Sequence, residues 1–480
     1  MKAKRRRPTM NKKSLLACAL ALASIGTAYA GGLPNFIVPV NMDAAGTGLN
    51  DTTAATPVGG NPGTTIGEQR RLAYQYAADL WNVVLDSANN TTVNVEASFS
   101  STMTCSATSA TLGSAGAKTI HADFANSVPS TWYGNALANA RAGTDVSPAG
   151  NEIVSRFNAR LGQADCLNGS GWYYGFDGIT PAGKISFLDV VMHEIGHGLN
   201  FQGFYNTATG APAGTAPNNF PDIYSRNVRD NNTGLAWTAM TDAQRVTAAI
   251  GDNLVWTGAN VTMQAPTELG AQINLFLAGP RAKDYPMVPA SYGPPPTPGN
   301  FTTTQVVRAF EPSGADSLGC AAFAAGAFTG KTVLIDRGTC SFKTKTLNAQ
   351  NAGAAKVIIG NNVPSGFPGM GDDTTITTPI TIPSVGVTQA TAIELKKYAL
   401  AGVQANLQTK PGQFAGTDPS GRVYLYAPSP LAPGSSFSHF DVRLTPNALM
   451  EPFINDSLNA AVELDLTPAL FKDIGWTVSP

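Results

Sequence analysis

The chain has 480 residues, of which 43% are hydrophobic, and it carries 31 basic and 32 acidic side chains. This hydrophobic content excludes a wholly disordered chain, and the length favours two domains over one. Only 13% of residues are charged, whereas Gly (49) and Pro (33) are abundant, so we expect many turns and long loops rather than a helical bundle.

The N-terminal segment predicts export. A basic stretch ending at Lys13 precedes an apolar run from Leu15 to Ile25 and the small-residue site Ala28-Tyr29-Ala30, which is the pattern of a signal peptide. We therefore expect residues 1–30 to be removed and the protein to be secreted, with the periplasm as the alternative destination. The apolar run is too short for the ~20 residues of a membrane span, and a lipidated Cys18 is a second rival.

The charge of the mature chain limits its partners. Residues 1–30 contain seven of the 31 basic residues and none of the 32 acidic ones, so 24 minus 32 leaves a net charge of −8. An acidic surface argues against nucleic acid or an anionic membrane as partner.

Four cysteines follow the predicted signal peptide: Cys105, Cys166, Cys320 and Cys340. An even number in an exported chain, without a Cys-x-x-Cys pair, predicts two disulfides rather than a metal cluster. Three connectivities are open, and proximity in sequence favours Cys105 with Cys166 and Cys320 with Cys340.

Periodicity predicts the elements of the first part of the chain. Apolar residues recur at helical spacing in 68–86 and alternate with polar ones in 91–99 and 118–124. In 184–201 apolar residues occur on nearly every face of the expected helix. In chain order we expect an irregular leader at 31–65, where a pro-segment is an option, a helix at Glu68–Asp86, strands at Thr91–Phe99 and Lys118–Phe124, and a buried helix at Lys184–Phe201 that starts with Ser186 and Asp189.

After residue 281 the pattern changes to alternating strands and helices. Six prolines between Pro286 and Pro298 predict a stiff linker. The elements expected beyond it are strands at Thr332–Asp336 and Lys356–Ile359, helices at Phe342–Asn351 and Ala390–Leu400, and a terminal amphipathic stretch at Leu466–Trp476.

The buried helix carries His193-Glu194-Ile195-Gly196-His197. Two histidines at i and i+4 project from one face of a helix, so both imidazoles can bind one zinc ion. Glu194 beside them can act as general base for an activated water. The His-Glu-x-x-His pattern therefore predicts zinc-dependent hydrolysis, and the plainer alternative is a helix with two structural histidines.

A catalytic zinc site needs a third protein ligand. The compact metzincin pattern continues with a glycine and a third histidine, but those positions are Asn200 and Gly203. No glutamate follows His197 before Glu268. The two remaining histidines are His121, in a predicted strand, and His439. We favour His439, with a plain loop histidine as its alternative and Asp222 and Asp441 as carboxylate fallbacks.

His439 in SSFSHFD and Met450 in ALMEP, together with the helix at Lys184–Phe201, resemble leishmanolysin-like metallopeptidases. The resemblance implies a metzincin-type site in which His193, His197 and His439 bind zinc, Glu194 is the general base, and Met450 forms a methionine turn beneath the metal. For Met450, ordinary core packing is the alternative.

The segments Gly330–Asn362 and Ile380–Leu400 resemble a protease-associated (PA) domain, through Asp-Arg-Gly-x-Cys-x-Phe, a helix and Ala-Gly-Ala in order. PA domains are non-catalytic modules inserted in peptidases, which accounts for the 242 residues between His197 and His439. For Asp336 and Arg337 we favour a structural ion pair over a binding role.

Together these patterns predict an α+β zincin-like catalytic domain interrupted by an α/β PA domain. The expected limits are 1–30 for the signal peptide, 31–283 and 412–480 for the two catalytic parts, and 284–411 for the linker and PA domain. We expect a secreted zinc endopeptidase with one catalytic ion and protein or peptide substrates. A zinc hydrolase of a non-peptide substrate and a PA-bearing binding protein with a non-catalytic zinc site stay open, and no calcium site can be assigned.

Overall fold

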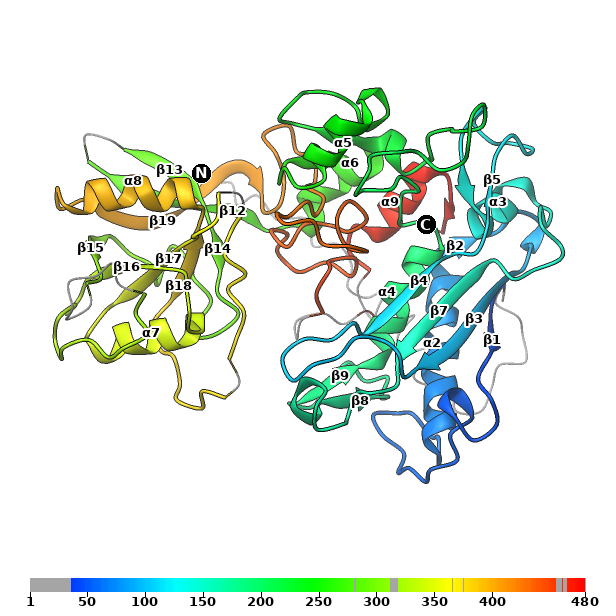
Figure 1. Ribbon diagram of the computed structural model, residues 1–480, viewed down its shortest axis with the longest axis horizontal. Helices are drawn as coiled ribbons and strands as arrows, with labels where there is room; N and C mark the ends of the chain where they lie inside the picture. The colour runs from blue at the N-terminus through cyan, green and yellow to red at the C-terminus, as the bar shows by residue number, and fades with distance from the viewer. Residues whose placement is uncertain are drawn as a thin grey trace, which may run out of the picture.

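The computed structural model describes residues 36–279, 282–310, 318–364, 366–373, 375–454, 460 and 464–479. The predicted signal peptide at 1–30, with Cys18, lies outside the described residues. None of the helices in the described ranges is long and apolar enough to cross a membrane. The described chain forms two lobes, and the chain after residue 414 returns to the first of them (Figure 1).

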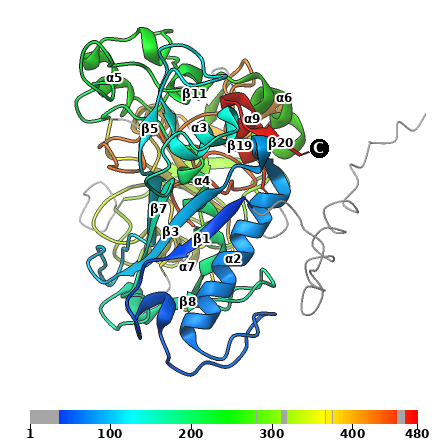
Figure 2. The same ribbon diagram turned by 90° about the vertical axis from the view of Figure 1, so that its right-hand side faces the viewer.

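The first lobe is built on a mixed four-stranded sheet, whose strands lie side by side in Figure 1; three of them are labelled in Figure 2. Three strands are parallel, and the fourth, an edge strand, is antiparallel to its neighbour. The order is β1 (Ile37–Asn41), β3 (Val93–Ser100), β7 (Ile153–Asn158) and β4 (Gly113–Ala117).

The sequence predictions for this sheet are partly correct. The strand expected at Thr91–Phe99 is confirmed as β3, but β1 lies within the segment predicted to be irregular. The strand expected at Lys118–Phe124 is reduced to two residues, and the edge strand β4 was not predicted because its sequence, Gly-Ser-Ala-Gly-Ala, has no alternating apolar pattern.

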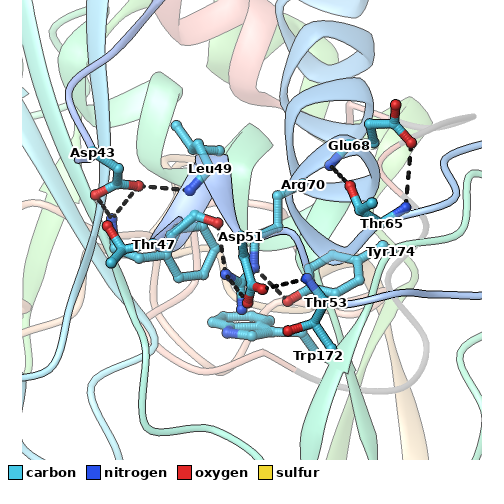
Figure 3. Close-up of polar contacts among 12 residues, drawn as sticks. Asp43, Thr47, Leu49, Asp51, Thr53, Thr65, Glu68, Arg70, Trp172 and Tyr174 are labelled. Carbon is cyan, nitrogen blue, oxygen red and sulfur yellow. Dashed lines mark hydrogen bonds and ion pairs between the residues drawn. The ribbon is translucent and has the colours of Figure 1, made fainter. Parts of the chain in front are cut away.

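The first helix, α2 (Ile66–Val84), confirms the helix predicted at 68–86. It begins with a capping box, in which Thr65 accepts from the Glu68 N–H and Glu68 accepts from the Thr65 N–H, each at 3.2 Å. Arg70 on this helix donates to the Tyr174 hydroxyl at 2.9 Å (Figure 3). It also donates to the Gly48 carbonyl at 2.8 Å. These contacts fasten the segment before α2 to the lobe.

The helix predicted at 184–201 is split into a short strand, β9 (Lys184–Ser186), and the helix α4 (Phe187–Gly198). Ser186 caps α4 as expected, because its side chain accepts from the Asp189 N–H at 3.2 Å. The helix packs against α2, β4 and β7 and is buried along almost its whole length. It is the central element of the first lobe.

Shorter elements complete the first lobe and bring the end of the chain back to its start. The strand β20 (Thr477–Val478) pairs with β2 (Leu85–Asp86), which directly follows α2. The other pairs and helices are β5 (Ile120–His121) with β6 (Tyr133–Gly134), β8 (Gly171–Tyr173) with β9, β10 (Val228–Asp230) with β11 (Leu254–Trp256), and α3 (Asn135–Ala142), α5 (Asp242–Ala248), α6 (Ala259–Glu268) and α9 (Thr467–Ile474).

The second lobe is an eight-stranded sheet with α7 (Phe342–Asn351) and α8 (Gln389–Ala399), on the left of Figure 1. Both helices and the two strands predicted here are confirmed to within one residue at each end. The strand order is β13 (Lys283–Pro286), β12 (Ala271–Ala278), β19 (Gln404–Phe414), β15 (Thr304–Arg308), β16 (Thr332–Asp336), β17 (Lys356–Gly360), β18 (Ser384–Val387) and β14 (Val288–Pro289).

Two expectations for this lobe are wrong. The proline-rich segment is not simply a linker, because β13 and β14 at its start belong to the sheet. Asp336 and Arg337 do not pair with each other: Asp336 forms an ion pair with Lys396 at 2.5 Å, and Arg337 donates to the Asn361 side chain at 3.0 Å.

Both predicted disulfides are confirmed. Cys105 is bonded to Cys166 in the first lobe, and Cys320 to Cys340 in the second. Each bond therefore lies within one lobe, and no disulfide joins the two lobes among the described residues.

Candidate metal centre

Three histidines from two distant segments converge. His193 and His197 lie on α4, and His439 lies in the segment that follows β19 and packs in the first lobe. Their Nε2 atoms are 3.0 Å apart for His193 and His197, and 3.2 Å apart for each of these with His439. Within the described residues this is the one group of three or more His, Cys, Asp or Glu side chains with the spacing of a metal site.

Each imidazole is oriented by a backbone carbonyl. The Nδ1 atom of His193 lies 2.7 Å from the Leu449 carbonyl oxygen, that of His197 lies 2.9 Å from Phe201 O, and that of His439 lies 2.9 Å from Ser435 O. A carbonyl only accepts, so each Nδ1 carries the proton. The Nε2 lone pair of every ring is therefore free to bind a metal ion.

Electrostatics keep these rings neutral. Burial, together with the neighbouring imidazoles, lowers the pKa of His197 to about 3 and that of His439 well below its ordinary value. Burial also lowers the pKa of His193. Neutral imidazole is the form that binds a metal ion.

The three nitrogens fit zinc. A tetrahedral ion with nitrogen ligands at ~2.05 Å places those ligands about 3.3 Å apart, close to the separations of 3.0 to 3.2 Å found here. Three neutral nitrogens, each supported by a carbonyl, are the donor set that zinc and similar transition metals prefer.

Glu194 is the acidic group of this region. Its side chain is buried against the edge strand β4, where a Cβ on Gly113 would lie 2.6 Å from its Oε1. Burial raises the pKa of Glu194 to about 8, partly offset by a hydrogen bond from the Ala115 N–H. A cation beside it would lower that pKa again.

Met450 lies directly under α4. It is fully buried, and a Cβ on Gly196 would come within 2.7 Å of its Sδ. A Cβ on Gly198 would come within 2.3 Å of Ile153 on β7. Close packing therefore explains the two glycines, which are otherwise unfavourable inside a helix. The floor role predicted for Met450 stays a prediction.

The other candidate ligands lie elsewhere. The His121 ring contacts Thr119 at 2.9 Å, and neither Asp222 nor Asp441 belongs to the histidine group. The Asp222 carboxylate accepts from two backbone N–H groups, and Asp441 pairs with Arg443 at 2.6 Å. Asn200, Gly203 and Glu268 do not belong to the group either.

Sequence reasoning missed Leu449 and Asp465. The Leu449 carbonyl orients His193, and the Leu449 N–H donates to the half-buried carboxylate of Asp465. A backbone carbonyl leaves no signature in a sequence, and Asp465 looks like any aspartate before a helix.

Comparison with known proteins supports one domain. Residues 302–395 match the family model of the PA domain, in agreement with the resemblance found in the sequence. No curated protein matches this chain.

Some solved structures are similar to part of this chain. A zinc aminopeptidase from Bacillus subtilis is 23% identical, with 32% of this chain and 37% of that chain covered and a TM-score of 0.21. A peptidase M28 precursor from Shewanella amazonensis SB2B is 16% identical (30% and 35% covered, TM-score 0.23). The subtilisin-like protease Apa1 from Pseudoalteromonas sp. AS-11 is 20% identical (32% and 35%, TM-score 0.21). The match thus spans little more than a third of each of these proteins.

These findings correct the family expected from the sequence. The family model that matches covers residues 302–395 alone and none of the three histidines, and no curated protein matches, so the metzincin-type family and the zincin-like label for the fold are withdrawn. What holds is an α/β lobe with a mixed sheet, joined to a PA domain. TM-scores this low assign the first lobe to no other family, and the spacing of His193 and His197 describes candidate ligands without naming a family.

Proposed function

We propose that this chain is a zinc-dependent peptidase in which His193, His197 and His439 hold one zinc ion. The observation that carries the proposal is the triangle of Nε2 atoms with sides of 3.0 to 3.2 Å. Zinc bound by three protein ligands supplies a Lewis acid that polarises a peptide carbonyl and acidifies water.

Glu194 acts in this proposal as general base. Its carboxylate is buried next to His193 in the sequence, and that burial raises its pKa to about 8. Such a group accepts a proton from water and passes it to the leaving amine. The Ala115 N–H holds the carboxylate in place against β4.

One ion fits better than two. The histidine group includes no carboxylate, and among the described residues no second group has the spacing of a metal site. A pair of bridged ions needs further ligands, mainly carboxylates, close to the first set. We therefore keep a single catalytic zinc.

The edge strand β4 supports endopeptidase action. In the described sheet β4 pairs with β7 alone, and the Ala115 N–H points to Glu194 on the open side. An open edge can pair with the backbone of an extended peptide, whose chain then continues on both sides of the scissile bond. Export, supported by the two disulfides, would bring the enzyme to protein substrates outside the cytoplasm.

The test uses Glu194→Gln, which keeps the shape of the side chain and removes its basicity. We expect wild type with one zinc per chain to cleave casein internally, and Glu194→Gln to retain the zinc and lose activity by ~100-fold or more. Cleavage sites are read by mass spectrometry and zinc by elemental analysis. Zinc-loaded wild type that cleaves no protein or peptide would contradict the proposal.

The same assay separates the alternatives. Release of single N-terminal residues alone would make the enzyme an aminopeptidase and contradict the endopeptidase assignment. Hydrolysis of esters without peptides would favour a non-peptide hydrolase. Equal behaviour of wild type and Glu194→Gln in every assay would favour a PA-bearing binding protein whose zinc site is structural.

A further inference from the structure

The three histidines differ in how far along the chain the carbonyl that accepts from their Nδ1–H lies. The acceptor for His197 is Phe201, four residues later and just past the end of α4. The acceptor for His439 is Ser435, four residues earlier in the same loop. The acceptor for His193 is Leu449, 256 residues away. His193 therefore depends on a tertiary contact for its orientation, whereas the other two rings are oriented locally.

A carboxylate secures that distant acceptor. The Leu449 N–H donates to Oδ2 of Asp465. The other oxygen of Asp465 accepts from the Thr467 N–H at 2.9 Å and from the Thr467 hydroxyl at 2.8 Å. Thr467 is the first residue of α9, which packs against α6. Asp465 thus links Leu449, the residue that orients His193, to the start of α9.

The backbone of Asp465 indicates that this position is constrained. Its φ is +48°, a left-handed conformation that costs a non-glycine residue on the order of 1 kcal/mol. Such a conformation persists only where surrounding contacts over-determine it. Here those contacts are the three hydrogen bonds to Leu449 and Thr467.

We propose that Asp465 is a positioning residue for the metal centre, which acts through Leu449 to orient the His193 ring toward the ion. The inference rests on the proposed function, since it assumes that the three histidines bind zinc. Groups that orient a metal-binding histidine typically change metal affinity 10- to 100-fold when they are removed. A residue that only stabilised α9 would leave that affinity unchanged.

The experiment compares Asp465→Ala with Asp473→Ala. Asp473 lies on α9 itself and, like Asp465, accepts from backbone N–H groups, those of Asn260 and Val261. It also accepts from the side chains of Asn260 and Trp256, and its hydrogen bonds do not include Leu449. We expect the zinc dissociation constant to rise ~10- to 100-fold in Asp465→Ala and to stay within ~2-fold of wild type in Asp473→Ala. Thermal melting of both variants shows whether their loss of stability is comparable.

A second readout follows the ring itself. In zinc-loaded protein with ¹⁵N-labelled histidine, we expect Asp465→Ala to shift or broaden the Nδ1–H signal of His193 and to leave those of His197 and His439 in place. Asp465→Asn, which retains one acceptor oxygen, should give a smaller change in both readouts and serves if the alanine variant does not fold.

The outcomes distinguish this inference from the proposed function. If wild type binds no zinc, the proposed function fails and this inference fails with it. If wild type binds zinc but Asp465→Ala and Asp465→Asn bind it as tightly, with the His193 signal unmoved, Asp465 is merely structural and only this inference is overturned.

Discussion

At the scale of single residues, the centre depends on which histidines meet. His193 and His197 are adjacent on one face of α4, as their spacing requires, but the third nitrogen could have come from several side chains. His439 lies 3.2 Å from both, whereas His121 contacts Thr119 outside the group. The identity of the third ligand is therefore open to a direct test.

We predict that His439→Ala lowers zinc affinity by ~100-fold or more, because two imidazoles cannot complete a three-ligand site. His121→Ala, a histidine of the same lobe, should bind zinc like wild type. Isothermal titration of metal-free protein with zinc measures both. Loss of zinc in His121→Ala with retention in His439→Ala would reverse the assignment.

We predict that stability depends on pH through Glu451, the residue after Met450. Burial raises its pKa from 4.5 to about 9, with its Oε1 accepting from the Ala448 N–H. Because the folded pKa is above the unfolded one, this contribution to stability is fully present below about pH 4.5 and is lost as the pH rises through about 9.

Glu451→Gln keeps the acceptor and cannot ionise. We therefore expect metal-free wild type to lose about 1 to 3 kcal/mol more stability than this variant between pH 5 and pH 8. Urea unfolding at the two pH values measures the difference. Parallel pH profiles for the two proteins would show that Glu451 is not protonated in the folded state.

At the scale of elements, α4 is selected by packing more than by helix propensity. Its two glycines each cost roughly 1 kcal/mol relative to alanine, yet side chains there would collide with Met450 and Ile153. The helix thus approaches β7 and the segment after His439 more closely than other residues would allow. That approach brings His193 within reach of the Leu449 carbonyl.

We predict that Gly198→Ala destabilises the protein by about 1 to 3 kcal/mol, although alanine favours helices, because its Cβ would lie 2.3 Å from the Ile153 side chain in the core. Gly150→Ala, where a Cβ meets nothing within 4 Å, is the control and should be neutral. Chemical denaturation tests both. A Gly198→Ala variant as stable as wild type would mean that Ile153 on β7 can shift at little cost in free energy.

At the scale of the whole molecule, the hydrophobic cores are separate. One cluster of buried residues includes α2, α4 and Met450 in the first lobe, and two further clusters lie in the second lobe. No disulfide among the described residues joins the lobes. Zinc binding should therefore stabilise one lobe without the other.

We predict two calorimetric unfolding transitions, of which a chelator shifts only one to lower temperature. Removing zinc that was present at 100 to 1,000 times its dissociation constant should lower the free energy of unfolding of that lobe by about 3 to 4 kcal/mol. Replacing Cys320 and Cys340 by serine is the matched control and should lower the other transition. A single transition that responds to both changes would indicate one cooperative unit.

The amino-acid sequence alone determined the local features: the histidine pair and Glu194 on one helix, and the α/β elements of the PA domain. These follow from spacing and periodicity within short segments. Only the tertiary structure decided that His439 joins the pair, that β4 borders Glu194, and that Asp465 secures Leu449. These contacts link residues far apart in the chain, so they depend on how the segments pack rather than on any local pattern.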